Sequence, residues 1–238
     1  YYFEEEPPIL FDVILHLGSL FVILYILRNE MKDFLSFMPS ALKKVNDRSN
    51  LKEEEKIVFF VILASIPTAI IGLFLEGTII VTFYDNMHLV GTCLIITGAV
   101  IWFSKDYNDN LSFDNLSSSN AFFVGIIQGL SILPGLSRSG LTIAFLRFFG
   151  LNPIKAARFS FLIFIPAIIG ATFLKINEVS DTIEEVGLFS IILGFSASVI
   201  SSFLSIKFLL KLLNNRKFHY FTPYCLVIGS VLIFESLI

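Results

Sequence analysis

The sequence predicts an all-α integral membrane protein with six transmembrane helices plus a re-entrant helix-loop-helix, in an inverted-repeat architecture whose first re-entrant segment is missing. The composition favours a membrane protein, because 55% of the 238 residues are hydrophobic, 16% are charged and the mean hydropathy is +0.80. Six apolar runs are long enough to span a bilayer, and a seventh is interrupted by the stretch PGLSRSG. The basic residues gather in alternate loops.

The six apolar runs follow one another with polar loops between them. Crossing about 30 Å of hydrocarbon takes roughly 20 helical residues. The runs lie at 9–27, 57–76, 88–104, 156–175, 187–210 and 220–238. No polar block is long enough to fold separately, so we expect one polytopic membrane domain over 1–238. We expect its partner to be the membrane, and no nucleic acid.

Basic residues set the predicted orientation of the spans. The loop 28–56 carries seven Lys and Arg residues and is expected to be cytoplasmic, whereas the loop 77–87 carries none and is expected outside. Span 88–104 therefore ends inside, and span 156–175 begins inside. The segment between them, 121–146, has to enter and leave by the same face, which predicts a re-entrant hairpin. Irregular backbone at that depth is tolerated when it is buried in protein or lines a wet cavity.

The order of the elements predicts two half-repeats. From residue 121 the chain reads re-entrant segment and then three spans, whereas residues 1–120 hold only three spans. An inverted repeat of equal halves is a common plan for membrane proteins with a site near the midplane. We therefore divide the chain into a truncated first half, 1–120, and a second half, 121–238. The re-entrant segment of the first half would lie upstream of Tyr1.

Arg138 lies in the middle of the interrupted run. A charged side chain at bilayer depth costs at least about 2.5–3.5 kcal/mol, so it requires compensation by anions, hydroxyls or water. One interpretation is structural, an arginine that ties loop carbonyls together. The other is an anion clamp, because the planar guanidinium donors match phosphate oxygens two at a time.

The neighbours of Arg138 favour the anion clamp. Pro134 is expected to end the first half-helix, and Gly135 frees the backbone to turn. Beside the start of the second half-helix stand three hydroxyl side chains, those of Ser137, Ser139 and Thr142. The exposed N–H groups of a helix N-terminus are themselves an anion site. The sequence therefore predicts a phosphate pocket at this turn.

Three further polar residues inside apolar runs are candidates for a role at the site. Gln128, seven residues before Gly135, either faces the substrate or is a helix-packing amide. Asp12 and His16 share one face of the first span with Ser19, because they are four and three residues apart. This trio is either a packed, hydrogen-bonded group or a second layer that supports the site.

The stretch PGLSRSGLT (134–142) resembles the PGxSRSxxT signature of the undecaprenyl-diphosphate phosphatase (bacitracin-resistance) family. Four other segments are similar to family segments and occur in family order: FDVILHLGSL, SIPTAIIGL, QGLSILPG and ARFSFLIFIPAIIGA. The resemblance covers essentially the whole chain, and the nine-residue signature is specific.

The resemblance implies a multi-pass plasma-membrane hydrolase that removes the terminal phosphate of a polyprenyl diphosphate. That reaction recycles the lipid carrier for cell-surface polymers such as peptidoglycan and gives bacitracin resistance. It also implies six spans with two re-entrant segments and a divalent metal, Mg²⁺ or Ca²⁺. Arg138 would be the phosphate-binding arginine. The family's second motif maps onto Pro134, Gly135, Ser137, Arg138, Ser139 and Thr142.

The chain departs from the family pattern in one respect. The family's other motif, a glutamate-rich EGxTE followed by PVSSTGH, is absent from it. The resemblance assigns to that motif the carboxylates proposed for metal binding or base work, and a serine and a histidine proposed for catalysis. We therefore expect metal ligands to be lacking here. We also expect the 238-residue chain alone to bind a diphosphate weakly and to hydrolyse it poorly.

Two alternatives of a different class stay open. Inverted repeats with re-entrant segments also occur in transporters, so a polyprenyl-phosphate transporter or flippase fits the same pattern. A catalytically dead family member with a structural or regulatory role fits the absent motif. The sequence also leaves open whether the protein forms a homodimer.

Overall fold

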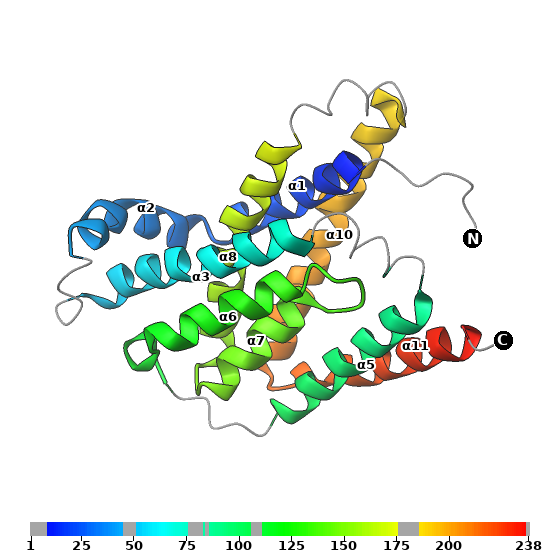
Figure 1. The fold of residues 1–238 in the computed structure, drawn as a ribbon. Helices are drawn as coiled ribbons and strands as arrows, with labels where there is room; N and C mark the ends of the chain where they lie inside the picture. The colour runs from blue at the N-terminus through cyan, green and yellow to red at the C-terminus, as the bar shows by residue number, and fades with distance from the viewer. Residues whose placement is uncertain are drawn as a thin grey trace. The chain divides into compact units, whose positions relative to one another are not determined.

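The structure is a computed structural model that describes residues 9–44, 51–75, 83, 86–105, 111–175 and 186–236. Within these ranges the regular secondary structure is helical, apart from one isolated bridge between Leu111 and Leu151. The helices, shown in Figure 1, are α1 Ile9–Ile26, α2 Arg28–Lys43, α3 Glu53–Leu75, α5 Met87–Phe103, η2 Phe113–Asn115, α6 Ser118–Leu130, α7 Arg138–Phe148, α8 Pro153–Leu174, α10 Leu188–Asn214, η4 Phe218–Tyr220 and α11 Phe221–Glu235. The predicted all-α class is confirmed for the described residues.

Each of the six predicted runs coincides with a described helix to within a few residues. Among the described residues, four helical segments are long and apolar enough to cross a membrane: α3, α8, α10 and the continuous segment Phe218–Glu235. The pair α1 and α2 counts as a fifth if it forms one span, and α5 is a shorter apolar helix. These helices are those of an integral membrane protein, while the count of six spans stays a prediction. Most of the loops predicted to lie outside, 77–87 and 177–187, falls beyond the described residues.

The chain divides into two compact units. Unit 1 comprises Tyr1–Lys32 and Phe164–Leu209, and unit 2 comprises Asp33–Ile163 and Leu210–Ile238. The division runs through α2, α8 and α10 and does not follow the half-repeats 1–120 and 121–238. Those half-repeats, and the single domain that contains them, stay a prediction.

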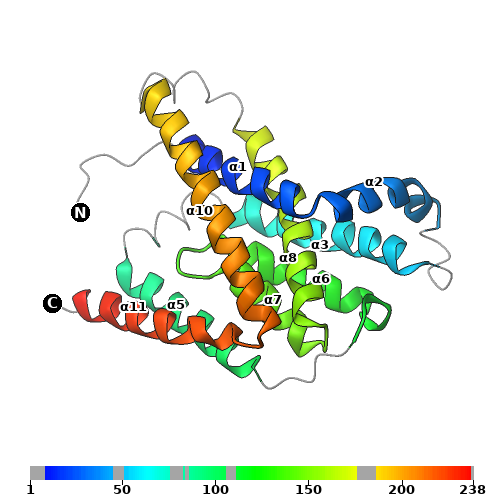
Figure 2. The ribbon, with the colours of Figure 1, turned by 180° about the vertical axis from the view of Figure 1, so that it is seen from behind.

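In unit 1, α1 and α10 cross at a contact between small residues (Figure 2). A Cβ on Gly18 would stand 2.9 Å from Ser198 Oγ, so the helices approach closely. The Ser198 hydroxyl donates a hydrogen bond to the Leu15 carbonyl on the other helix. Small residues and cross-helix hydroxyl bonds are the usual means by which helices associate in lipid, where the hydrophobic effect does not act between them.

Two close helix pairs form the frame of unit 2, α5 with α11 and α3 with α6 (Figure 1). A Cβ on Gly91 would lie 2.6 Å from the Gly229 carbonyl oxygen, and one on Gly229 would lie 2.7 Å from the Gly91 oxygen. On the other pair, a Cβ on Gly125 would lie 2.1 Å from the Ala64 oxygen. Backbone therefore packs against backbone at both crossings.

Helix α2 is a correction to the predicted loop 28–56. The structure has a helix over Arg28–Lys43, which follows α1 after a break at Leu27. Its apolar residues recur at helical spacing, which is a signal that the sequence carries; the positions are Met31, Phe34, Leu35, Met38 and Leu42. Its charged residues lower its mean hydropathy below that of a membrane span, so the sequence predicted it as part of a loop. Lys44, at its end, forms a 2.9 Å ion pair with the buried carboxylate of Glu55 on α3.

The close crossing of α5 and α11 predicts that a methyl group added at a glycine there is destabilising. Gly229→Ala should lower the free energy of unfolding by about 1–3 kcal/mol, because the added methyl collides with backbone. Gly72→Ala on α3 is the matched control, because a Cβ there meets no neighbouring atom within 4 Å in the part of the chain that the structure describes. It should be neutral or raise stability by about 0.5–1 kcal/mol through helix propensity. Thermal unfolding in detergent measures both, and equal effects would contradict this packing.

Candidate functional site

The interrupted run forms an antiparallel helical hairpin. Helices α6 and α7 lie side by side (Figure 1), and Phe123 near the start of α6 packs edge-on against Phe145 near the end of α7, with ring centroids 5.5 Å apart. At the base, the Leu111 N–H donates to the Gly150 carbonyl at 3.0 Å. The Asn152 N–H donates back to the Leu111 carbonyl at 3.4 Å. The two ends of the segment therefore meet, and residues 131–137 form the tip.

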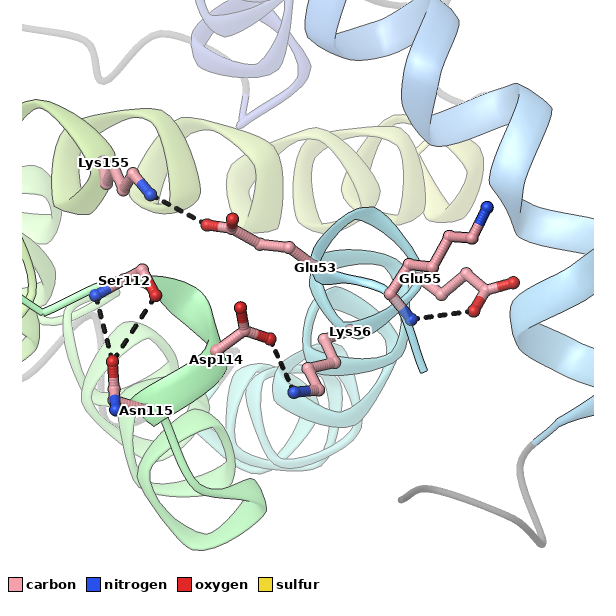
Figure 3. A network of polar contacts seen from close by, with 8 residues as sticks. Glu53, Glu55, Lys56, Ser112, Asp114, Asn115 and Lys155 are labelled. Atoms are coloured by element: carbon pink, nitrogen blue, oxygen red, sulfur yellow. Dashed lines mark hydrogen bonds and ion pairs between the residues drawn. The ribbon is translucent and has the colours of Figure 1, made fainter. Parts of the chain in front are cut away.

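Ion pairs join the base of the hairpin to the neighbouring helices (Figure 3). Lys56 on α3 contacts Asp114 of η2 at 2.6 Å, and Glu53 on α3 contacts Lys155 on α8 at 2.8 Å. These side chains are partly exposed, so each pair contributes at most about 1 kcal/mol. The pairs fix where the segments before and after the hairpin lie rather than supplying much stability.

Arg147 lies at the C-terminal end of α7. It lies in the last turn of that helix with only 2% of its surface exposed. Its Nη2 donates to the Lys105 carbonyl just beyond α5 at 3.2 Å. A cation at the C-terminal end of a helix also complements the helix dipole.

The tip of the hairpin contains a tight turn built by Pro134 and Gly135. Helix α6 ends at Leu130, and i to i−3 hydrogen bonds continue to Leu133, so the half-helix ends earlier than the proline predicted. The Leu136 N–H then donates to the Leu133 carbonyl at 3.2 Å, and Gly135 has φ +89°. Proline at the second position and glycine with positive φ at the third are the signature of a type II turn.

This turn packs directly on α5. A Cβ on Gly135 would lie 2.3 Å from the Val90 carbonyl oxygen and 2.9 Å from the Cβ of Cys93. Thr97, one turn further along α5, contacts the same segment through its hydroxyl. Glycine is therefore required at position 135 twice over, by its backbone angle and by the lack of space.

The turn directly precedes the N-terminus of α7. Ser137 is the N-cap, and its Oγ accepts the Gly140 N–H at 3.2 Å. Arg138 is the first residue of the helix and is half-buried. The first N–H groups of a helix have no acceptor within it and carry the positive end of its dipole. The structure thus places the guanidinium-bearing residue, a serine cap and a helix start together, as the sequence predicted.

The other predicted hydroxyls occupy different surroundings. Ser139 is half-buried in the first turn of α7. Thr142 is fully buried, and its Oγ1 donates to the Arg138 carbonyl at 2.8 Å and lies 2.6 Å from Ser160 Oγ on α8. The sequence reasoning missed Ser160, although a serine within the apolar stretch ARFSFLIFIP was a signal. A catalytic role for Thr142 stays a prediction, and this hydroxyl pair ties α7 to α8.

Gln128 makes the contacts of a helix-packing amide. It is 3% exposed, and its Nε2 donates to the Ile163 carbonyl on α8 at 3.0 Å. Thr68 Oγ1 on α3 lies 3.4 Å from the same nitrogen. Its Oε1 is buried and has no hydrogen-bond partner among the described residues. Substrate contact by Gln128 stays a prediction, while the amide joins α6 to its two neighbours.

Asp12 and His16 belong to unit 1. The Ser19 hydroxyl donates to the His16 carbonyl at 2.8 Å, and the exposed His16 ring packs on Phe164 with centroids 6.4 Å apart. The side chain of Asp12 lies outside the described residues. The supporting role predicted for these residues stays a prediction.

Across the described ranges, no group of three or more His, Cys, Asp or Glu residues is placed to hold a metal ion. The residues gathered at the hairpin tip are donors and hydroxyls, which suit an anion rather than a cation. The described residues do not fit the metal that the resemblance implies, and no step below is routed through one.

Comparison with known proteins places this site in a family. The sequence profile of the bacitracin resistance protein BacA family matches residues 2–231. The chain belongs to the BacA family. An undecaprenyl-diphosphatase of Methanobrevibacter smithii is 34% identical over 241 residues, which cover 98% of this chain and 86% of that protein.

Two further BacA relatives bear the same name. The undecaprenyl-diphosphatase of Desulfosudis oleivorans is 33% identical over 95% of this chain and 84% of its own length. That of Bacteroides thetaiotaomicron is 31% identical over 98% of this chain and 86% of its own length. The family resemblance stated from the PGLSRSGLT stretch is therefore confirmed.

Gly135 is the position at which the site should be least tolerant of a methyl group. Gly135→Ala adds both the strain of a positive φ, about 1–2 kcal/mol, and a collision with the backbone of α5. Gly187→Ala is the matched control, because Gly187 has φ +80° but no neighbouring atom of the described residues within 4 Å of its Cβ position. Thermal unfolding in detergent should show a clearly larger loss for Gly135→Ala. Equal losses would show that the turn is not docked on α5.

Proposed function

We propose that this protein is an undecaprenyl-diphosphatase, which converts undecaprenyl diphosphate and water into undecaprenyl phosphate and phosphate, and that its hairpin tip binds the diphosphate. The observation that carries the proposal is the helix start at Arg138, set by the Ser137 cap inside the signature of the BacA family. The names of the BacA relatives supply the substrate.

The hairpin tip has the chemistry that a diphosphate needs. The guanidinium of Arg138 offers a planar pair of donors to two phosphate oxygens. The N–H groups at the start of α7 and the dipole of that helix attract the same anion. Ser137 Oγ already accepts the Gly140 N–H, so its own proton is left to donate. Together these groups offer several hydrogen-bond donors and positive charge to one anion.

The same groups serve the reaction. Hydrolysis breaks the anhydride P–O bond, the terminal phosphoryl group passes to the oxygen of water, and undecaprenyl phosphate leaves. Phosphoryl transfer depends chiefly on positioning and on stabilising the charge of the phosphoryl oxygens. Arg138 and the α7 N-terminus supply that stabilisation here. The family resemblance assigns the nucleophile-activating groups to its other motif, together with a divalent metal, Mg²⁺ or Ca²⁺, as a further part of the proposal.

The fold supports the proposed membrane setting. The closed base of the hairpin, where Leu111 and Leu151 meet, supports a segment that enters and leaves by one face of the plasma membrane. The tip then packs on α5, where a Cβ on Gly135 would meet the Val90 carbonyl, because irregular backbone at depth has to lie against protein or a wet cavity. The proposed topology has six spans. The apolar tail of the substrate lies along helix faces that carry exposed hydrophobic side chains, such as Ile66 and Ile70 on α3.

Phosphate release separates this proposal from a transporter or flippase. In detergent micelles there is no second compartment, so transport cannot occur and only hydrolysis can consume the substrate. The full gene product should there release one phosphate for each undecaprenyl phosphate formed. Substrate consumption with stoichiometric phosphate is the expected result. Tight binding of the lipid with no phosphate released would overturn the enzymatic proposal and favour the transporter.

Arg138→Ala should reduce phosphate release by about 10²-fold or more, the usual cost of removing a donor that stabilises transition-state charge. Arg138→Lys keeps the charge but loses the planar fork, so its activity should fall between those of the wild type and the alanine variant. Arg28→Ala is the control, because Arg28 is exposed and bonds the Tyr25 carbonyl of its own segment. Steady-state kinetics measure all three. Near wild-type turnover by Arg138→Ala would show that the clamp is assigned to the wrong residue.

A further inference from the structure

Thr97 is a fully buried hydroxyl in the middle of the apolar helix α5. Threonines in such helices usually satisfy their hydroxyl on the carbonyl one turn back in the same helix. Thr92 on α5 does so with the His88 carbonyl at 2.8 Å, and Thr172 on α8 does so with the Ile168 carbonyl at 2.7 Å. The hydrogen bonds of Thr97 instead cross to the signature turn.

The hydroxyl of Thr97 bonds both sides of that turn. It donates to the Gly135 carbonyl at 3.2 Å and accepts the Ser137 N–H at 3.2 Å. A hydroxyl has one proton to donate and two lone pairs to accept with, so both bonds can form at once. The two bonded groups bracket Leu136 and stand directly before Arg138. One side chain therefore fixes the last residues before the start of α7.

We propose that Thr97 is a positioning residue for the diphosphatase reaction, whose hydroxyl holds the Gly135–Ser137 segment so that Arg138 and the first N–H groups of α7 face the diphosphate. This inference rests on the function proposed above. It assigns to α5 a part in substrate binding that the signature motif does not contain.

The Thr97 hydroxyl affects the site because it fixes the direction in which α7 starts. Ser137 is the N-cap, so the orientation of its backbone determines where the helix axis points and where its Oγ meets Gly140. Without the Thr97 hydroxyl, the part-buried Gly135 carbonyl and Ser137 N–H would each lose this partner, and the turn would no longer be held in one orientation on α5. A shift of about 1 Å in a positioned group can lower a rate by about 10²-fold.

Three variants of the full gene product test the proposal. Thr97→Val keeps the shape and removes the hydroxyl, whereas Thr97→Ser keeps the hydroxyl and removes a methyl group. Thr222→Val is the matched control, because Thr222 is also buried and donates to the α5 carbonyl of Gly98 at 3.1 Å, one residue from Thr97, without contacting the turn. If Thr97→Val does not fold, Thr97→Ala takes its place.

Kinetics of phosphate release give the first result. We expect Thr97→Val to lower kcat/KM by about 10- to 100-fold, with a change in melting temperature no larger than that of Thr222→Val. Thr97→Ser should recover most of the activity, and Thr222→Val should stay near wild type. Equal kinetics in Thr97→Val and Thr222→Val would overturn the proposal.

Amide hydrogen exchange gives a second result that does not depend on activity. Exchange in peptides covering residues 131–141 should become faster in Thr97→Val and stay unchanged in Thr222→Val and Thr97→Ser. If the wild-type protein releases no phosphate, the proposed function fails while this readout still reports whether Thr97 holds the turn. Unchanged exchange in Thr97→Val would show that it does not.

Discussion

The contact of Gly135 with the backbone of α5 is the constraint on which the rest of unit 2 depends. The glycine takes a positive φ and leaves no room for a methyl group beside the Val90 carbonyl. Helix α5 can hold this position because it is itself fixed against α11, where Gly91 and Gly229 bring the two backbones together. A chain of close packing thus runs from the last helix of the protein through α5 to the turn and on to the first residue of α7.

This chain of contacts explains how a polar turn is accommodated in so apolar a protein. Every unpaired backbone group in an apolar medium is costly, so the turn has to be satisfied by protein. The Ser137 cap, the Thr97 hydroxyl and the Leu133–Leu136 turn bond satisfy much of it internally. The positive end of α7 is where we propose that an anion binds. In that proposal the same few hydrogen bonds serve both folding and binding.

The sequence predicted the helices well, because a long apolar run is a strong local signal; α3 and α8 lie within a few residues of their expected bounds. It also predicted the cluster at Arg138, since turn-forming residues and a helix start are neighbours in the chain. It could not predict that Thr97 and Ser160 bond the motif, because those contacts depend on how distant helices pack. The helix α2 was missed for a different reason, since its charges hid an apolar spacing that was present.

We propose that the start of α7 binds the phosphate groups of the substrate. A solid-state NMR measurement of the distance between the ¹⁵N-labelled amide of Ser139 and the ³¹P nuclei of bound undecaprenyl diphosphate, in the full gene product in lipid, tests it most directly. A hydrogen bond from that amide to a phosphate oxygen places the two nuclei about 4 Å apart. We predict that distance. A bound diphosphate whose phosphorus nuclei both lie more than twice as far from the amide would contradict the account.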